Sequence, residues 1–365
     1  MVGAQPIAVA APADPRVMSF TLDGEWVIAQ HPLHRVFEAT APVYRNFFKM
    51  TPEQWAAGSA GSKAGATGVG AGPGLDFGKG VAMALDRPIG LIPCALGATS
   101  MNDWDPALLD RGEESLYGNL IHRAGQVGGR IRGVLWYQGE ADVSNGEAVA
   151  AYEAKMLNLI DRLRADLNAP ELPFIFAQVS RYVYSEDLGT TWERGREIQR
   201  GLPGKRPHVY MVPTIDLPLS DLIHVSAEGQ RRLGQRMAEV ALTCVYEQPG
   251  HATPIDFASI EVMPAISPYQ QPVRVRFSGV NGRLVASGRL WGFETRAVAG
   301  NAKPLPKPWA VELDPDNADC VIVWLNAPLE EPVDLYYGAG MNPYVNLVDE
   351  KDMAVPAFGP VRVEP

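Results

Sequence analysis

The chain has 365 residues, of which 46% are hydrophobic and 20% charged, a composition typical of a globular protein long enough for two domains. Its formal net charge of -10 comes without a dense basic run, which argues against nucleic acid or an anionic membrane surface as a partner and favours a small neutral substrate. No apolar run approaches the roughly 20 residues that span a bilayer. The three cysteines lie far apart without metal-ligand spacing, so each is expected to be a structural buried thiol, and the sequence implies neither a metal nor an organic cofactor.

The first 80 residues predict loops rather than regular structure. Clusters of Pro, Gly and Ala recur, as in residues 11–15 and 65–74, and no apolar run is available for a first strand. This is unusual for an α/β domain, because the first strand of such a domain normally lies in the middle of its sheet.

From Gly74 to Cys244, segments with helical spacing alternate with short apolar runs. Helices are expected over 75–85, 113–124, 152–167 and 192–200 and from Ser226 onward, and strands over 88–93, 134–137, 174–179 and 208–212. Repeated alternation of this kind predicts the α/β class with a parallel sheet.

After about Gly250 the pattern changes to period-two alternation, with Asn-Gly and Pro-rich turns between the apolar runs. Strand candidates are 273–277, parts of 288–296, and 320–325. We expect a C-terminal β domain over residues 249–365, joined by a linker near residues 247–254 to an α/β domain over residues 1–248.

A polar group follows one of the predicted strands. The apolar run that begins at Val134 stops at Gln138-Gly139-Glu140, which places polar side chains at the carboxyl end of a buried strand, where open α/β sheets bind their ligands. A buried Gln and Glu in this position can equally be hydrogen-bonded struts, so the motif alone leaves both interpretations open.

A second polar group lies between the last predicted strand and the last helix. Asp221 precedes His224 by three residues there, and an Asp at this spacing can orient an imidazole so that it acts as a general base. An isolated Asp-x-x-His pair is more often structural. The position of this pair at the same end of the sheet as Gln138 favours the catalytic interpretation.

Together these stretches resemble the SGNH hydrolase superfamily, and specifically its sialate O-acetylesterase and plant-type carbohydrate esterase branch. The blocks that carry the resemblance occur in the family's order within about residues 1–246, and they are 72–77 (Gly-Pro-Gly-Leu-Asp-Phe), 89–95, 134–143 with Trp-Tyr-Gln-Gly-Glu, and 221–224 (Asp-Leu-Ile-His). The segments 335–347 and 356–358 more weakly resemble the closing strands of the accessory β domain in sialate O-acetylesterases.

The resemblance implies an α/β fold with a three-layer, doubly wound parallel sheet of the flavodoxin-like type, whose first strand is expected to be missing from this chain. It also implies hydrolysis of O-acetyl esters on carbohydrates through a serine ester intermediate. In that mechanism His224 would be the base and then the acid, and Asp221 would hold its tautomer. Gly97 would offer a backbone N–H, and Gln138 a side-chain amide, to the oxyanion, while Glu140 would brace the loops. Each preorganised oxyanion donor lowers the barrier by on the order of 3 kcal/mol.

The chain departs from the family at two points. Where the family often has Gly-Gly-Thr, this chain has Gly97-Ala98-Thr99, and the loop is strained there if Ala98 takes a positive φ. In the family a Gly-Gln-Ser-Asn turn after the first strand carries the nucleophile, and the segment that begins at Met1 resembles the family's sequence immediately after that turn. We therefore expect the nucleophilic serine to lie upstream of Met1 and the chain as given to be inactive.

Other serines are weaker candidates for the nucleophile. Ser100, in the predicted oxyanion loop, is a poor substitute, because a donor loop and a nucleophile approach the carbonyl from different positions. Ser180 is expected to line the cleft or to bond the backbone, and Ser226 to cap the last helix.

Two alternatives to a carbohydrate O-acetylesterase remain open. One is a non-catalytic carbohydrate-binding protein that kept the cleft and lost its serine. The other is an SGNH esterase that acts on lipid or thioester substrates. An acetylated carbohydrate is the expected partner, and the sequence leaves open which sugar it is, the oligomeric state, and whether the protein is secreted, periplasmic or retained in the cell.

Overall fold

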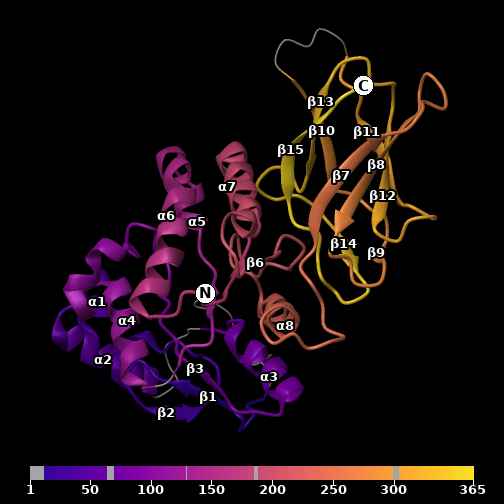
Figure 1. Cartoon of the computed structure of the whole chain (residues 1–365). Helices are drawn as coiled ribbons and strands as arrows, with labels where there is room; N and C mark the ends of the chain where they lie inside the picture. The colour runs from indigo at the N-terminus through magenta and orange to yellow at the C-terminus, as the bar shows by residue number, and fades with distance from the viewer. Residues whose placement is uncertain (1–11, 64–69, 129, 185–187, 299–303) are drawn as a thin grey trace.

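Helices and strands both occur up to Cys244, and the described residues after it form strands but no helix (Figure 1). The computed structural model describes residues 12–63, 70–128, 130–184, 188–298 and 304–365. The helices are α1 (Pro42–Phe47), α2 (Pro52–Lys63), α3 (Gly74–Leu85), α4 (Leu116–Gln126), α5 (Glu140–Val143), α6 (Gly146–Asp166), α7 (Gly189–Gly201) and α8 (Ala227–Cys244). The strands are β1 (Val17–Phe20), β2 (Trp26–Ile28), β3 (Ile89–Leu91), β4 (Val134–Trp136), β5 (Phe174–Ala177), β6 (Val209–Val212), β7 (Asp256–Val262), β8 (Gln271–Ser278), β9 (Leu284–Ala286), β10 (Phe293–Ala297), β11 (Pro308–Leu313), β12 (Cys320–Leu325), β13 (Val333–Tyr337), β14 (Leu347–Asp349) and β15 (Phe358–Val363).

The strands β4, β5 and β6 form a parallel sheet in that order, with Ile175 of β5 opposite Leu135 on one side and Tyr210 on the other. Successive side chains of a strand point to opposite faces of its sheet. Phe174 and Phe176 accordingly pack with α4 and α6, whereas Ile175 packs with α3 and α8. Helices cover both faces, which confirms the predicted three-layer α/β architecture.

The parallel strands fall into two groups rather than one continuous sheet. In the second group β1 lies between β2 and β3, with Met18 opposite Gly90 in the parallel pair and Phe20 opposite Trp26 in the antiparallel pair. Within the described residues, β3 and β4 are therefore the neighbouring edges of two separate sheets.

Helices α3 and α8 pack side by side on one face of the α/β part (Figure 1). They approach closely at Gly234, where a Cβ would lie 2.3 Å from the carbonyl oxygen of Pro73. This contact holds the amino-terminal half of α8 in place, and with it the loop that precedes α8. None of the helices that the structure describes is both long and apolar enough to cross a membrane.

The expectation of loops over the first 80 residues is wrong in part, because β1, β2, α1 and α2 lie there. The two strands span only four and three residues, too few to show a period, and β2 is exposed throughout. Helix α2 lacks an apolar stripe but begins with a capping box, in which Thr51 N–H donates to the Gln54 side chain and Gln54 N–H donates to Thr51 Oγ1. This Thr-x-x-Gln signal was available in the sequence.

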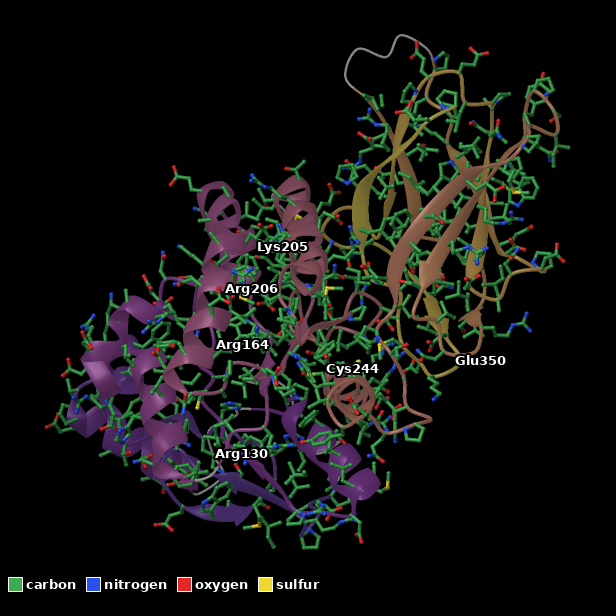
Figure 2. All side chains as sticks on the ribbon, in the orientation of Figure 1. Arg130, Arg164, Lys205, Arg206, Cys244 and Glu350 are labelled. Atoms are coloured by element: carbon green, nitrogen blue, oxygen red, sulfur yellow. The ribbon has the colours of Figure 1, made fainter. Side chains whose placement is uncertain are left out.

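The strands from β7 onward pair antiparallel, in the orders β11-β12-β8-β7, β10-β13-β15 and β14-β9. Their core is continuous with the α/β part, since Val275 and Val323 belong to the same hydrophobic cluster as Met237 of α8. Cys244, at the end of α8, is partly buried between the two parts (Figure 2), and all three cysteines are free. The division at residue 248 stays a prediction.

A buried arginine joins the α/β part to the β strands. Arg196 of α7 is 1% exposed, and its guanidinium donates only to backbone carbonyl oxygens. The acceptors come from both parts of the chain, and they are Val179 (3.3 Å), Ser180 (2.8 Å), Gly338 (3.3 Å), Gly340 (2.5 Å) and Met341 (3.1 Å). Met341 and Ile223, the residue before His224, both pack against the hydrophobic cluster that contains Trp192.

Candidate active site

The loop between β6 and α8 positions His224. Leu219 and Val225 form an isolated antiparallel bridge across it, and Ser220 N–H donates to the His224 carbonyl oxygen at 3.0 Å. Ser226 then caps α8, because its Oγ accepts a hydrogen bond from Gly229 N–H at 3.2 Å, as its sequence position predicted. The histidine is thus held between a closed loop and a fixed helix start.

The carboxylate of Asp221 makes three hydrogen-bonding contacts, two with His224 and one with Ile223. Its Oδ2 lies 2.8 Å from the His224 Nδ1, and its Oδ1 accepts hydrogen bonds from the backbone N–H groups of His224 (2.7 Å) and Ile223 (2.9 Å). Burial alone would raise the pKa of Asp221, but these hydrogen bonds hold it below its ordinary value. An ionised Asp221 favours the tautomer with its proton on Nδ1, which leaves Nε2 free to accept a proton.

Gly97 lies in an exposed turn after β3 with open space around it. A Cβ on Gly97 would meet no atom within 4 Å, and its N–H has no hydrogen-bond acceptor within the described part of the chain. The neighbouring Ala98 has φ 61°, so the strain that the sequence made conditional is present. An available N–H in an open turn is what an oxyanion donor requires.

Gln138 is buried and ties the loop after β3 to β4. Its Nε2 donates to the Thr99 carbonyl oxygen at 3.1 Å and to the Asp142 carboxylate, while its Oε1 is buried without a partner among the described residues. Both N–H groups are therefore engaged in this arrangement. The predicted donation to an oxyanion requires Gln138 to exchange one of these two acceptors for the ligand.

Asp142 is a site residue that sequence reasoning missed. Its carboxylate also accepts the Met101 N–H at 3.0 and 3.2 Å, so it holds both the Gln138 side chain and the turn that carries Gly97. Burial raises the pKa of Asp142, and the hydrogen bond from Gln138 opposes the rise. The signal in the sequence was the position of Asp142, four residues after Gln138 and within the short helix α5.

Glu140 begins α5, is partly buried and lies within electrostatic reach of His224. Burial raises the pKa of Glu140, while hydrogen bonds from nearby backbone amides and the charge of His224 act in the opposite direction. No direct hydrogen bond joins the two side chains among the contacts described. The predicted bracing role for Glu140 stays a prediction.

The predicted residues open onto one cavity of about 860 Å³. Its lining includes Gly97, Gln138, Glu140 and His224, and Asp221 reaches it through its bond to His224. His34 also lines this cavity, and no sequence pattern drew attention to it. Burial lowers the pKa of His34 to about 3, with a smaller contribution from Arg123, so the imidazole is neutral at physiological pH.

The hydroxyls of three serines near the site bond to groups other than the His224 side chain. The Ser100 hydroxyl donates to Asp103 at 2.8 Å, and the Ser180 hydroxyl donates to the Thr214 carbonyl oxygen at 3.1 Å, in line with their predicted secondary roles. Ser144 is the serine of the described chain that lines the cavity, and its hydroxyl donates to the Glu140 carbonyl oxygen at 2.7 Å. The predicted upstream serine lies outside the described residues.

No group of three or more His, Cys, Asp or Glu side chains in the described ranges is arranged to hold a metal ion. The arrangement that is present consists of a carboxylate-held imidazole, an available backbone N–H and a side-chain amide around one cavity. Groups of these kinds serve in hydrolase sites that work by acyl transfer to a nucleophile and then to water, and their role in this chain stays a prediction.

Comparison with known proteins agrees with this class. The family model described as "SASA: Carbohydrate esterase, sialic acid-specific acetylesterase" matches residues 4–243, and the chain belongs to this family. The probable carbohydrate esterase At4g34215 of Arabidopsis thaliana is 37% identical over 181 residues, which cover 48% of this chain and 64% of that protein. The chain thus matches less than two thirds of the length of this curated relative.

Two solved structures resemble the chain. The carbohydrate acetylesterase XAC1771 from Xanthomonas citri aligns with 99% of this chain and 79% of its own, with a TM-score of 0.68 and 21% identity, which shows a shared fold. The structure of the Arabidopsis thaliana protein AT4G34215 aligns with 65% of this chain and 87% of its own, with a TM-score of 0.50 and 30% identity. The α/β core followed by β strands is therefore an architecture that the XAC1771 structure shares.

Proposed function

We propose that this protein hydrolyses O-acetyl esters on carbohydrates through a serine ester, with His224 and Asp221 as its acid–base pair. The observation that carries the proposal is the 2.8 Å contact between His224 Nδ1 and Asp221 Oδ2, on a histidine that faces the same cavity as Gly97. Membership of an acetylesterase family supports the acetyl group and the carbohydrate as the substrate class.

The chemistry proceeds in two halves. The serine oxygen attacks the acetyl carbonyl while Nε2 of His224 takes its proton, and the oxyanion that forms accepts hydrogen bonds from Gly97 N–H and the Gln138 amide. Collapse of this intermediate breaks the bond to the sugar oxygen, which receives the proton from His224. Water then attacks the acetyl-serine, gives a proton to His224, and acetate leaves as the serine regains that proton.

The serine in this mechanism comes from outside the residues that the structure describes. Ser144 lines the cavity, but its hydroxyl donates to the Glu140 carbonyl oxygen instead of to His224. We therefore expect the chain by itself to form no acetyl-enzyme. Incubation with p-nitrophenyl acetate should then show no burst of p-nitrophenol. A burst equal to the protein concentration would mean that a residue of this chain is the nucleophile.

The test of the proposal is acetate release by the chain extended at its amino end with a strand that ends in Gly-Gln-Ser-Asn. Acetylated xylan and O-acetylated sialic acid serve as substrates, and a lipid ester serves as the comparison. Release of acetate from either carbohydrate is expected, at a higher kcat/KM than for the lipid ester. Binding of the carbohydrates without acetate release would favour a carbohydrate-binding protein instead.

A further inference from the structure

Three aromatic rings form a stack that runs from the core to the surface beside the site. Trp192 of α7 is fully buried, and the centroid of its ring lies 5.3 Å from that of Tyr182. Tyr182 is partly buried, and its ring is stacked on that of Tyr184 at 5.1 Å, with an angle of 7° between the two ring planes. Stacked rings at this spacing attract one another, so the buried tryptophan helps to fix both tyrosines.

The outer tyrosine presents a flat aromatic surface to solvent. Tyr184 is 49% exposed although Tyr182 covers one face of its ring, so the other face and the edge supply most of the exposed surface of that ring. Tyr182 and Tyr184 thus form an aromatic platform. Val183, between them in the sequence, and Leu222 of the loop that carries His224 are exposed as well, which makes the surface around the platform apolar.

Backbone hydrogen bonds tie the aromatic platform to its surroundings on two sides. Val183 N–H donates to the Leu222 carbonyl oxygen at 2.7 Å, which joins the platform to the loop that carries His224. Tyr182 N–H donates to the Met341 carbonyl oxygen at 2.9 Å, which joins it to the chain after β13. The position of the platform relative to His224 is therefore set by the backbone, as a binding surface requires.

The aromatic platform is continuous with the candidate active site. Tyr182 lines the cavity of that site together with Ile223 and His224, and Tyr184 stacks on Tyr182 and is exposed. A ligand whose acetyl group lies at His224 and which extends along the stack meets the ring of Tyr184 as it leaves the cavity. The platform is thus placed to hold a part of the ligand next to the part that reacts.

The chemistry of the aromatic platform suits a neutral sugar ring. The face of an aromatic ring is negative and attracts the C–H groups that a pyranose presents on its own face, while the hydroxyl groups of both partners lie at the edges. Asp221, the residue before Leu222, is ionised and would repel a sugar that carries a carboxylate. A lipid chain has no hydroxyl groups to pair with those of the tyrosines.

We propose that the aromatic platform binds a neutral pyranose ring next to the acetylated one, so that the site takes acetylated oligosaccharides or polysaccharides in preference to free acetylated sugars. The placing of the acetyl group at His224 rests on the proposed function. Binding of the sugar ring itself needs no nucleophile. Acetylated xylan is then a better substrate than free O-acetylated sialic acid, which has a carboxylate and no neighbouring ring.

Isothermal titration calorimetry on the full chain tests the binding. Acetylated xylohexaose should bind at least about fivefold more tightly than acetylated xylose, because only the hexaose reaches the aromatic platform. Tyr184→Ala should weaken binding of the hexaose at least about fivefold, and Tyr184→Trp, which keeps an aromatic ring, should restore it. Circular dichroism confirms that the variants are folded.

Tyr269→Ala is the matched control, since Tyr269 is an exposed tyrosine between β7 and β8, and it should bind the hexaose as the unaltered chain does. Equal binding of the hexaose by Tyr184→Ala and Tyr269→Ala would overturn the proposal. Failure of the hexaose to bind the folded chain would overturn it too. Tighter binding of O-acetylated sialic acid, or of micelles of a lipid ester, would contradict the choice of a neutral sugar.

Turnover by the serine-containing extended chain separates this inference from the proposed function. Tyr184→Ala should lower the ratio of kcat/KM for acetylated xylan to kcat/KM for p-nitrophenyl acetate at least about fivefold, through a higher KM for xylan. The same ratio in Tyr184→Ala and Tyr269→Ala would contradict the role of the aromatic platform and leave the esterase chemistry standing. Binding of the hexaose that depends on Tyr184, without acetate release, would support the platform and count against the esterase chemistry.

Discussion

Replacing Arg196 by methionine tests how the β strands are attached behind the site. The substitution keeps an unbranched, flexible side chain, although a shorter one, and removes the donors to five carbonyl oxygens on both parts of the chain. At about 1 kcal/mol for each hydrogen bond, the loss is about 5 kcal/mol. The methionine variant no longer buries a charge, and this offsets about 2 kcal/mol of the loss. We therefore expect the free energy of unfolding to fall by about 3 kcal/mol.

Urea unfolding, followed by both tryptophan fluorescence and far-ultraviolet circular dichroism, measures this loss. Arg194→Met is the matched control, because Arg194 lies on the same helix with its side chain exposed, and its effect should stay within about 0.5 kcal/mol. A loss below about 1 kcal/mol in Arg196→Met would refute the account of Arg196 as the joint between the two parts. An equal loss of stability in Arg194→Met would refute it as well.

Three further predictions concern the loops of the site. Ala98→Gly should raise the free energy of unfolding in urea by about 0.5–1 kcal/mol, because it relieves the positive φ of 61°, while Ala95→Gly in the same loop should not. Asp221→Asn should have a lower free energy of unfolding than the unaltered chain at neutral pH. Because the pKa of Asp221 is depressed in the folded chain, this difference should shrink as the pH falls below 3.8, the ordinary pKa of an aspartate. A difference that stays constant over this pH range would count against the pairing with His224. Ser226→Ala should cost about 1 kcal/mol through the lost cap of α8, and Ser226→Asp should recover most of it.

Much of the α/β part was predictable because its elements carry local signals. Helix α8 has a capping serine and an apolar face, and β4 is a short apolar run that stops at polar residues, so both were placed correctly. The segment before α3 was not, because β1 and β2 are short and α2 is stabilised by a cap rather than by an apolar stripe. Sequence periodicity has no signal for elements of that kind.

For the site, the sequence indicated which residues come together more readily than it indicated their hydrogen bonds. His224, Gln138 and Gly97 do line one cavity, and Asp221 does hold the histidine. That both N–H groups of Gln138 are already engaged depends on where two loops meet, which no local pattern encodes.

The most direct test of the proposed mechanism is the rate of acetate release from acetylated xylan by the serine-containing extended chain and its His224→Ala variant. His122→Ala, an exposed histidine on α4, is the control and should keep the full rate. Loss of the general base should lower kcat by at least about 1000-fold while the variant still binds the polysaccharide. A His224→Ala variant that releases acetate at the rate of the control would contradict the assignment of His224 and, with it, the proposed site.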